Sequence, residues 1–265
     1  MRQWQRCADS VCFPRHAYIR HHWRRAERQG IVGVDPFSTL LNIPVFDYFG
    51  WVAWDLGKKA LDYAASQNAR VVNMSYGPAT KGATFLSGEL NLFQNYNSTT
   101  PGKGMLIVRA GGNDGVNALN QAFTGDAPSQ LSNLLIVGSV NASNVISSFS
   151  NRPGNACIGG SQSSCTANDT NALMNFWLVA PGENILSDLP NNYLGYMSGT
   201  SMATPTVAGA AALVFQRALK KTFSGDQLNS HRFNKAGSDA IVSHLTCGIN
   251  ENSFYAIWTH GQKPW

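Results

Sequence analysis

The chain has 265 residues, 43% of them hydrophobic, which is enough for one sizeable core. No run approaches the roughly 20 consecutive apolar residues that a membrane-spanning helix needs. The first thirty residues also lack the continuous apolar stretch of a secretory signal. The 25 glycines suit a loop-rich α/β enzyme better than a helical bundle. We therefore expect a globular α/β protein without a membrane span, and the sequence assigns it no compartment.

The formal net charge of +5 is concentrated at one end of the chain. Residues 1–30 hold seven arginines against two acidic side chains, whereas the remaining residues are balanced. A basic arm of this kind can contact nucleic acid or acidic lipid. Another explanation of the arm, given below, leads us to expect no nucleic-acid role.

Strand and helix patterns alternate from about residue 30 onward. Apolar runs that end in glycine or turn residues predict strands at 38–46 (interrupted by Pro44), 69–77, 105–113, 134–140 and 176–182. Helical patterns cover 51–68, 86–96 and 200–220. Continuously apolar strands that alternate with helices indicate a mainly parallel sheet covered on both faces. In such folds, functional groups gather at the carboxyl ends of the strands.

Ser201 lies where the glycine-rich turn "SGTS" becomes an apolar helix. Gly199 permits a close approach just before it, and Pro205 is expected within the first helical turn, where a missing N–H has no partner to lose. The positive end of the helix dipole would favour negative charge developing beside Ser201. Serine is also a common helix cap. The residues alone leave both interpretations open: a nucleophile or a cap.

Two further motifs follow predicted strands. Asn113, in "RAGGNDG", could donate its side-chain amide to an oxyanion, or could simply be a turn asparagine. In "NMSYG", Ser75, Tyr76 and Gly77 could offer main-chain groups to an extended peptide, or could form an ordinary turn.

Together these motifs resemble those of subtilisin-family serine proteases. "GTSMATP" resembles the nucleophile motif, "RAGGNDG" the oxyanion segment, and "VVNMSYG" the segment that pairs with substrate; "FSNRPG" and "LVAPGENILS" also resemble family core sequence. The resemblance covers residues 30–219. It implies that Ser201 is the nucleophile and Asn113 the oxyanion donor. It also implies a substrate-binding set made up of Ser75, Tyr76, Gly77, Gly111 and Gly112.

The chain departs from the family pattern at several points. Tyr76 and Pro78 are unusual near the substrate segment, and a cysteine-bearing insertion follows Gly154. Cys157 and Cys165, which flank that polar loop, could form a disulfide or remain two free thiols. The resemblance implies a three-layer α/β subtilisin-like fold with a mainly parallel sheet. We expect this chain to lack the N-terminal strand and the histidine helix of that fold.

The family's chain order is Asp, His, Ser, so a histidine motif should precede "GIVGVDP". His16, His21 and His22 stand there, but without the small neighbours that such a motif requires. For one choice of permitted codons, residues 14–30 read one base later encode a run beginning His-Gly-Thr-His. We therefore hypothesise that residues 1–29 are an out-of-frame arm. Residues 30–238 would be a partial peptidase domain and 239–265 an irregular C-terminal segment.

The resemblance implies a serine endopeptidase that acts on peptides or proteins. We assign no cofactor and no metal-ligating residue, and the sequence leaves calcium binding open. Because its histidine and aspartate are not recognisable here, we expect the chain itself to be inactive. The alternatives are a non-catalytic peptide-binding relative and an intact hydrolase that uses one of the three N-terminal histidines. The family is usually secreted, but the sequence does not locate this product and predicts no oligomeric state.

Overall fold

A computed structural model describes residues 33–46, 52, 54–97, 104–125, 131–159, 162–189 and 193–220. Within this part of the chain, no helix is long and apolar enough to cross a membrane. The expected 1–29 arm and the 239–265 segment lie outside the described residues, as do His16, His21 and His22.

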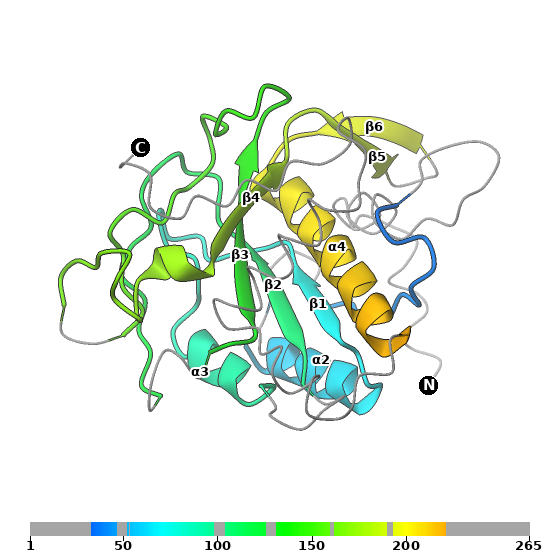
Figure 1. The fold of residues 1–265 in the computed structure, drawn as a ribbon, viewed down its shortest axis with the longest axis horizontal. Coiled ribbons are helices and arrows are strands. Elements are labelled where there is room, and N and C mark those ends of the chain that lie inside the picture. Colours follow the sequence, from blue (N-terminus) through cyan, green and yellow to red (C-terminus); the bar gives the residue numbers. More distant parts are fainter. Residues whose placement is uncertain are drawn as a thin grey trace.

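A parallel sheet forms the centre of the protein (Figure 1). Its four strands lie in the order β1 (Val71–Met74), β2 (Leu106–Ala110), β3 (Leu134–Val140) and β4 (Trp177–Pro181). Every residue of β2 and β3 is buried, as expected for strands covered on both faces. These strands confirm four of the five predicted ones.

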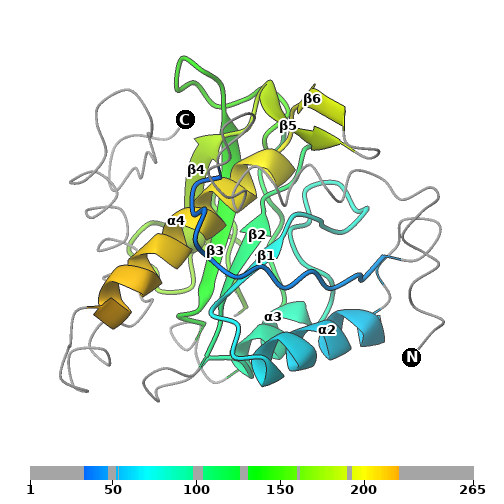
Figure 2. The ribbon, with the colours of Figure 1, turned by 90° about the vertical axis from the view of Figure 1, so that its right-hand side faces the viewer.

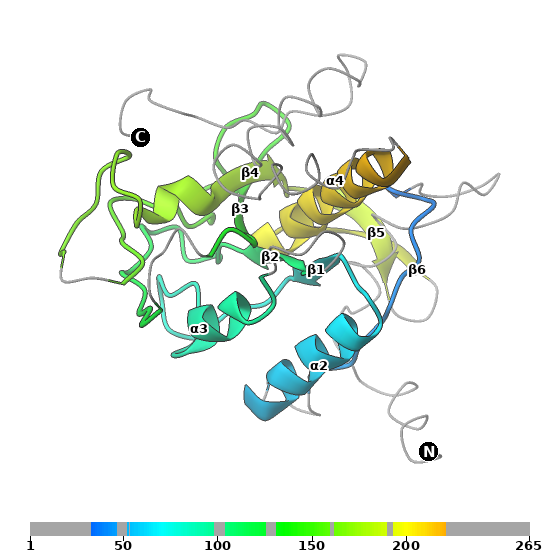
Figure 3. The ribbon, with the colours of Figure 1, turned by 60° about the horizontal axis from the view of Figure 1, so that its bottom comes forward.

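Helix α4 (Thr200–Lys220) covers one face of the sheet, as Figure 3 shows. Its small side chains Ala203, Ala208 and Ala211 are fully buried against strand residues such as Val108 and Val137. Small residues let the helix axis approach the sheet closely, which fixes the start of the helix relative to the strand ends.

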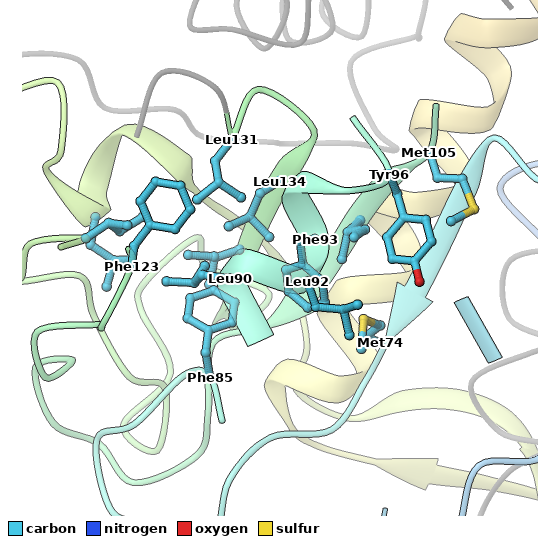
Figure 4. Packing of buried hydrophobic residues seen from close by; sticks show 14 of the residues in the cluster. Met74, Phe85, Leu90, Leu92, Phe93, Tyr96, Met105, Phe123, Leu131 and Leu134 are labelled. Atoms are coloured by element: carbon cyan, nitrogen blue, oxygen red, sulfur yellow. The ribbon is translucent and has the colours of Figure 1, made fainter. Parts of the chain in front are cut away.

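Helices α2 (Trp54–Ser66) and α3 (Glu89–Gln94) lie on the opposite face (Figure 3). The core on this side gathers residues such as Phe85, Leu90, Phe93 and Leu134 (Figure 4). The rings of Phe85 and Phe93 meet edge to face, with 6.0 Å between their centroids. The result is the predicted three-layer α/β arrangement.

An antiparallel hairpin stands beside the start of α4 (Figure 2). It consists of β5 (Ile185–Leu189) and β6 (Tyr193–Met197), and it follows the short 3₁₀ helix η3 (Leu173–Phe176) and β4. This hairpin was not predicted from the sequence, although "PNN" between two apolar runs is a recognisable turn signal.

The predicted strand at 38–46 is wrong. The segment makes only an isolated bridge, between Phe46 and Val52. The buried carboxylate of Asp35 instead accepts from the N–H groups of Phe37 and Ser38, and Gln216 of α4 donates to it over 2.7 Å. At the start of the predicted strand the Ser38 N–H is thus bonded to a side chain, and near its end Pro44 offers no N–H to a ladder.

The two cysteines of the insertion form a disulfide. Cys157 and Cys165 are both buried, with Cα atoms 5.5 Å apart, and they pack against Ala172. Asn120 ties the same loop down, because its amide donates to the carbonyls of Gln162 and Ser163. Of the two alternatives that the sequence leaves open, the structure shows the disulfide.

Candidate active site

Ser201 is the second residue of α4 and is half-buried. Its hydroxyl donates to the carbonyl oxygen of Ser75 over 3.1 Å. Ser75 directly follows β1, so the start of α4 lies at the carboxyl end of the sheet (Figure 1). The first N–H groups of a helix have no intrahelical acceptor, and together with the helix dipole they favour negative charge here.

A second hydrogen bond runs in the opposite direction between the same two residues. The hydroxyl of Ser75 donates to the carbonyl oxygen of Ser201 over 3.0 Å. Helix geometry assigns that carbonyl to the N–H four residues later, but that residue is Pro205. Ser75 therefore replaces the donor that proline lacks. The expectation that Pro205 costs no hydrogen bond is wrong, because α4 begins at Thr200 and Pro205 lies just past the first turn.

Asn113 is exposed, yet its orientation is fixed. Its Oδ1 accepts from the backbone N–H of Thr200 over 2.8 Å and from the Thr200 hydroxyl over 2.9 Å. Because a backbone N–H can only donate, these bonds identify the amide oxygen and leave Nδ2 as the outward group. A Cβ on Gly199 would lie 3.4 Å from Nδ2, an ordinary van der Waals contact, so Gly199 lies directly beside the amide.

Thr200 is a site residue that reasoning from the sequence missed. It is fully buried, and its hydroxyl both donates to Asn113 and accepts from the N–H of Gly112 over 3.2 Å. It thereby links the start of α4 to the loop that follows β2. Its place next to Ser201 in "GTSMATP" was visible, but nothing in that pattern indicates which loop its hydroxyl reaches.

Thr200→Val should lower the free energy of unfolding by about 1–3 kcal/mol, because Val keeps the shape but leaves the Gly112 N–H without an acceptor. Thr200→Ser retains the hydroxyl and is the matched control. Urea denaturation of both variants gives the comparison. Equal stability of the Val variant and the wild type would show that the hydroxyl does not hold this loop.

Close packing sets the shape of the loop after β2. Gly112 has φ +102°, and a Cβ there would overlap the side-chain amide of Asn151. The N–H of Gly111 donates to the carbonyl of Val137 over 2.9 Å, and a Cβ on Gly111 would lie 2.6 Å from the ring of Trp177. Both glycines are therefore required by the loop that presents Asn113.

Asn151 completes the support of this loop. Its Oδ1 accepts from the N–H groups of Asp114 and Val116, and its Nδ2 donates to the Asp114 carboxylate. The N–H of Gly82 also donates to Asp114, and this bond, with that from Asn151, lowers the pKa of the carboxyl. The "FSNRPG" motif thus contributes an anchor for the loop that carries Asn113.

The residues after β1 differ in exposure. Tyr76 is half-buried and packs against the core, and burial raises its pKa to about 12, so the phenol stays neutral at ordinary pH. Gly77 is exposed, and no atom lies within 4 Å of the position that its Cβ would take. Directly after Tyr76 the main chain is therefore exposed and no side chain crowds it.

The described site holds a serine hydroxyl, an oriented amide donor and a helix N-terminus. All six histidines of the chain, at positions 16, 21, 22, 231, 244 and 260, lie outside the described residues. The structure therefore brings Ser201, Asn113, Ser75 and Gly112 together and places no imidazole beside them within its described part.

Comparisons with known proteins give the family of the chain. A sequence model described as the Subtilase family matches residues 25–251. The chain belongs to the subtilase family. This subtilase is 32% identical to Subtilisin BL of Lederbergia lenta over 209 residues, which is 79% of this chain and 64% of that protein.

Other relatives cover a similar part of the chain. An alkaline protease of Shouchella clausii is 31% identical over 79% of this subtilase and 46% of its own length. The major intracellular serine protease of Bacillus subtilis is 32% identical over 73% of this chain and 54% of its own length. The subtilase thus spans between about half and two thirds of these relatives.

Solved structures agree on the fold. The self-cleaved protease domain of PatA superposes with a TM-score of 0.60 at 23% sequence identity, covering 82% of this subtilase and 71% of that domain. At this identity the likeness concerns the fold, and it confirms the expected subtilisin-like α/β architecture.

Proposed function

We propose that this subtilase carries the acyl-transfer site of a serine endopeptidase, with Ser201 as nucleophile and Asn113 as oxyanion donor. The observation that carries the proposal is the pair of hydrogen bonds that Thr200 donates to Asn113 Oδ1. These bonds turn Nδ2 outward beside the start of α4. A donor fixed before the reaction needs no reorganisation when charge develops, which is the main source of electrostatic catalysis.

The reaction would follow the chemistry of acyl transfer. Ser201 Oγ forms a bond to the peptide carbonyl carbon, and its proton passes to a base. The resulting oxyanion accepts from Asn113 Nδ2 and from a backbone N–H at the start of α4. Collapse breaks the C–N bond and the amine leaves with the proton, after which water hydrolyses the ester.

The substrate would be an extended peptide or protein. Ser75, Tyr76 and Gly77 would form one wall of the cleft, and Gly111 and Gly112 would support the other. The exposed, uncrowded Gly77 favours a main chain approaching this edge. No cofactor is required by this chemistry. Because one relative is named as an intracellular protease, the family relation assigns no compartment.

We also propose that the 265-residue polypeptide itself turns over substrate negligibly. Its histidines at 16, 21 and 22 lack the small-residue setting of the family motif. The arm at residues 1–29, interpreted as out of frame, leaves domain 30–238 without a recognisable triad histidine or aspartate.

A non-catalytic peptide-binding role is the second candidate. The observation that favours it is the bond from Ser201 Oγ to the Ser75 carbonyl, which holds the hydroxyl on an acceptor that cannot take its proton. Both candidates predict a peptide cleft and negligible turnover by this polypeptide, and they differ in whether Ser201 can act as a nucleophile once a base is available.

Gly77→Val tests the cleft that both candidates share. The new side chain meets open space in the free protein, so folding should be unaffected, while it would occupy the edge expected to receive a peptide. We expect at least about a tenfold loss of affinity for fluorescein-labelled casein, measured by fluorescence anisotropy, since a steric block of one or two kcal/mol suffices for this.

Gly57→Val is the matched control, because it adds the same side chain on α2, away from the site. Wild-type affinity in the Gly77 variant would contradict the location of the cleft. A wild-type protein that does not bind casein would contradict both candidate functions.

A further inference from the structure

Arg109 places a charge inside the sheet. It belongs to β2, in which all residues are buried, and its side chain is 0% exposed. A buried guanidinium must be paired and hydrogen-bonded to be tolerated. Here Nη1 and Nη2 donate to the two carboxylate oxygens of Glu89 over 3.0 and 2.9 Å, and Nε donates to the carbonyl of Thr84 over 3.3 Å.

Glu89 is itself held in place. It is 4% exposed, and its Oε2 also accepts from the N–H of Leu86 over 2.9 Å. The bidentate pair therefore joins β2 to the start of α3 with little freedom of rotation. The plane of the guanidinium is therefore held in one orientation.

The Tyr76 ring lies against the face of the Arg109 guanidinium. Its ring centroid is 4.7 Å from Arg109 Cζ, within the range of a cation–π contact. Phe46 meets the same ring edge to face, with 5.5 Å between centroids. The Tyr76 ring is thus held from two directions, by a cation and by another ring.

The position of Tyr76 bears directly on the candidate site. Arg109 pairs with Met74 in the β1–β2 ladder, and Tyr76 stands two residues beyond Met74. Ser75, between them, makes both hydrogen bonds with Ser201. On the other strand, Asn113 stands four residues after Arg109. Arg109 therefore belongs to the strand that leads to Asn113, and its side chain contacts the segment that follows β1.

We propose that Arg109, fixed by Glu89, is a positioning residue that sets the Tyr76 ring and thereby the backbone of the 75–77 segment. This inference rests on the proposed peptide-binding role of that segment. A purely stabilising role explains the pair less well, because buried ion pairs replaced by well-packed apolar residues often leave stability unchanged or improved.

The test separates positioning from stability by replacing the whole pair. Glu89→Leu/Arg109→Met removes both charges while keeping the volume, and should retain the wild-type unfolding midpoint within a few degrees. We expect its apparent affinity for fluorescein-labelled casein to fall about tenfold. Tyr76→Leu should show a similar loss, and the triple variant no further loss, because the residues act through one contact. Gly57→Val, on α2 and outside the binding segments, is the control and should bind like the wild type.

Hydrogen exchange provides a readout that does not depend on peptide binding. The backbone amides of Tyr76 and Gly77 should exchange about tenfold faster in the double variant, while those of β3 stay unchanged, because the 75–77 segment alone loses its support. If the wild-type protein binds no casein, the proposed function fails. The exchange rates of the Tyr76 and Gly77 amides then still show whether Arg109 positions the 75–77 segment.

A stable double variant with unchanged exchange at Tyr76 and Gly77 would overturn the inference, as would full casein affinity or additive effects in the triple variant. If the double variant does not fold, the same exchange comparison in Tyr76→Leu decides the result. Faster exchange at Gly77 supports positioning by Tyr76, and unchanged exchange overturns it.

Discussion

Proteolysis by the purified 265-residue subtilase should fall at the background rate, about 10⁶-fold below that of an intact family member. Subtilisin loses about this factor in kcat when its histidine is removed. The physical reason is that no histidine recognisable as the family's base is present to take the proton of Ser201, whose hydroxyl donates instead to the Ser75 carbonyl.

Release of dye from fluorescein-labelled casein, compared between wild type and Ser201→Ala, measures this directly. Equal rates support the proposal, since the serine then contributes nothing to turnover. A wild-type rate that disappears in Ser201→Ala would contradict inactivity and favour an intact hydrolase. Labelling of Ser201 by a fluorophosphonate would independently lead to the same conclusion.

Arg109→Met alone should lower the free energy of unfolding by about 3–5 kcal/mol. The substitution leaves the Glu89 carboxylate 4% exposed and without its bidentate partner. An uncompensated buried charge costs far more than the lost attraction, so the loss should exceed that of an ordinary core truncation of similar size. Urea denaturation at neutral pH gives the value.

The control for this prediction is the double variant Glu89→Leu/Arg109→Met, which should recover most of the loss. Lys58→Met, which breaks an exposed pair with Asp62 on α2, should change stability by less than about 1 kcal/mol. A single Arg109 variant as stable as the wild type would show that the carboxylate finds water or another donor.

Much of the fold follows from local pattern. The apolar run at 134–140 predicts β3 with its observed bounds, and the small-residue helix at 200–220 coincides with α4. These segments are long or uniformly apolar, so their period is unambiguous. The segment at 38–46 is also rich in apolar residues, but the Ser38 N–H is bonded to Asp35 and Pro44 has no N–H for a ladder. A side-chain hydrogen bond of that kind has no periodic signature in the sequence.

Part of the candidate site can likewise be predicted from the sequence, and part cannot. Ser201 and Asn113 are identifiable because their motifs resemble those of a known family. The contacts that orient them are not, since Thr200 reaches a loop 87 residues earlier in the chain and Ser75 donates to the Ser201 carbonyl, 126 residues away. Arg109 stands in the "RAGGNDG" motif, but the sequence assigns it no role, because only the fold brings the Tyr76 ring against its guanidinium.

The most direct measurement is a crystal structure of this subtilase with an extended peptide bound. We predict that the peptide backbone lies along the 75–77 segment and that one of its carbonyl oxygens lies about 3 Å from Asn113 Nδ2. Ser201 Oγ should face the carbon of that carbonyl. A peptide bound on another face of the protein, or a carbonyl turned away from Asn113, would contradict the assignment of this site.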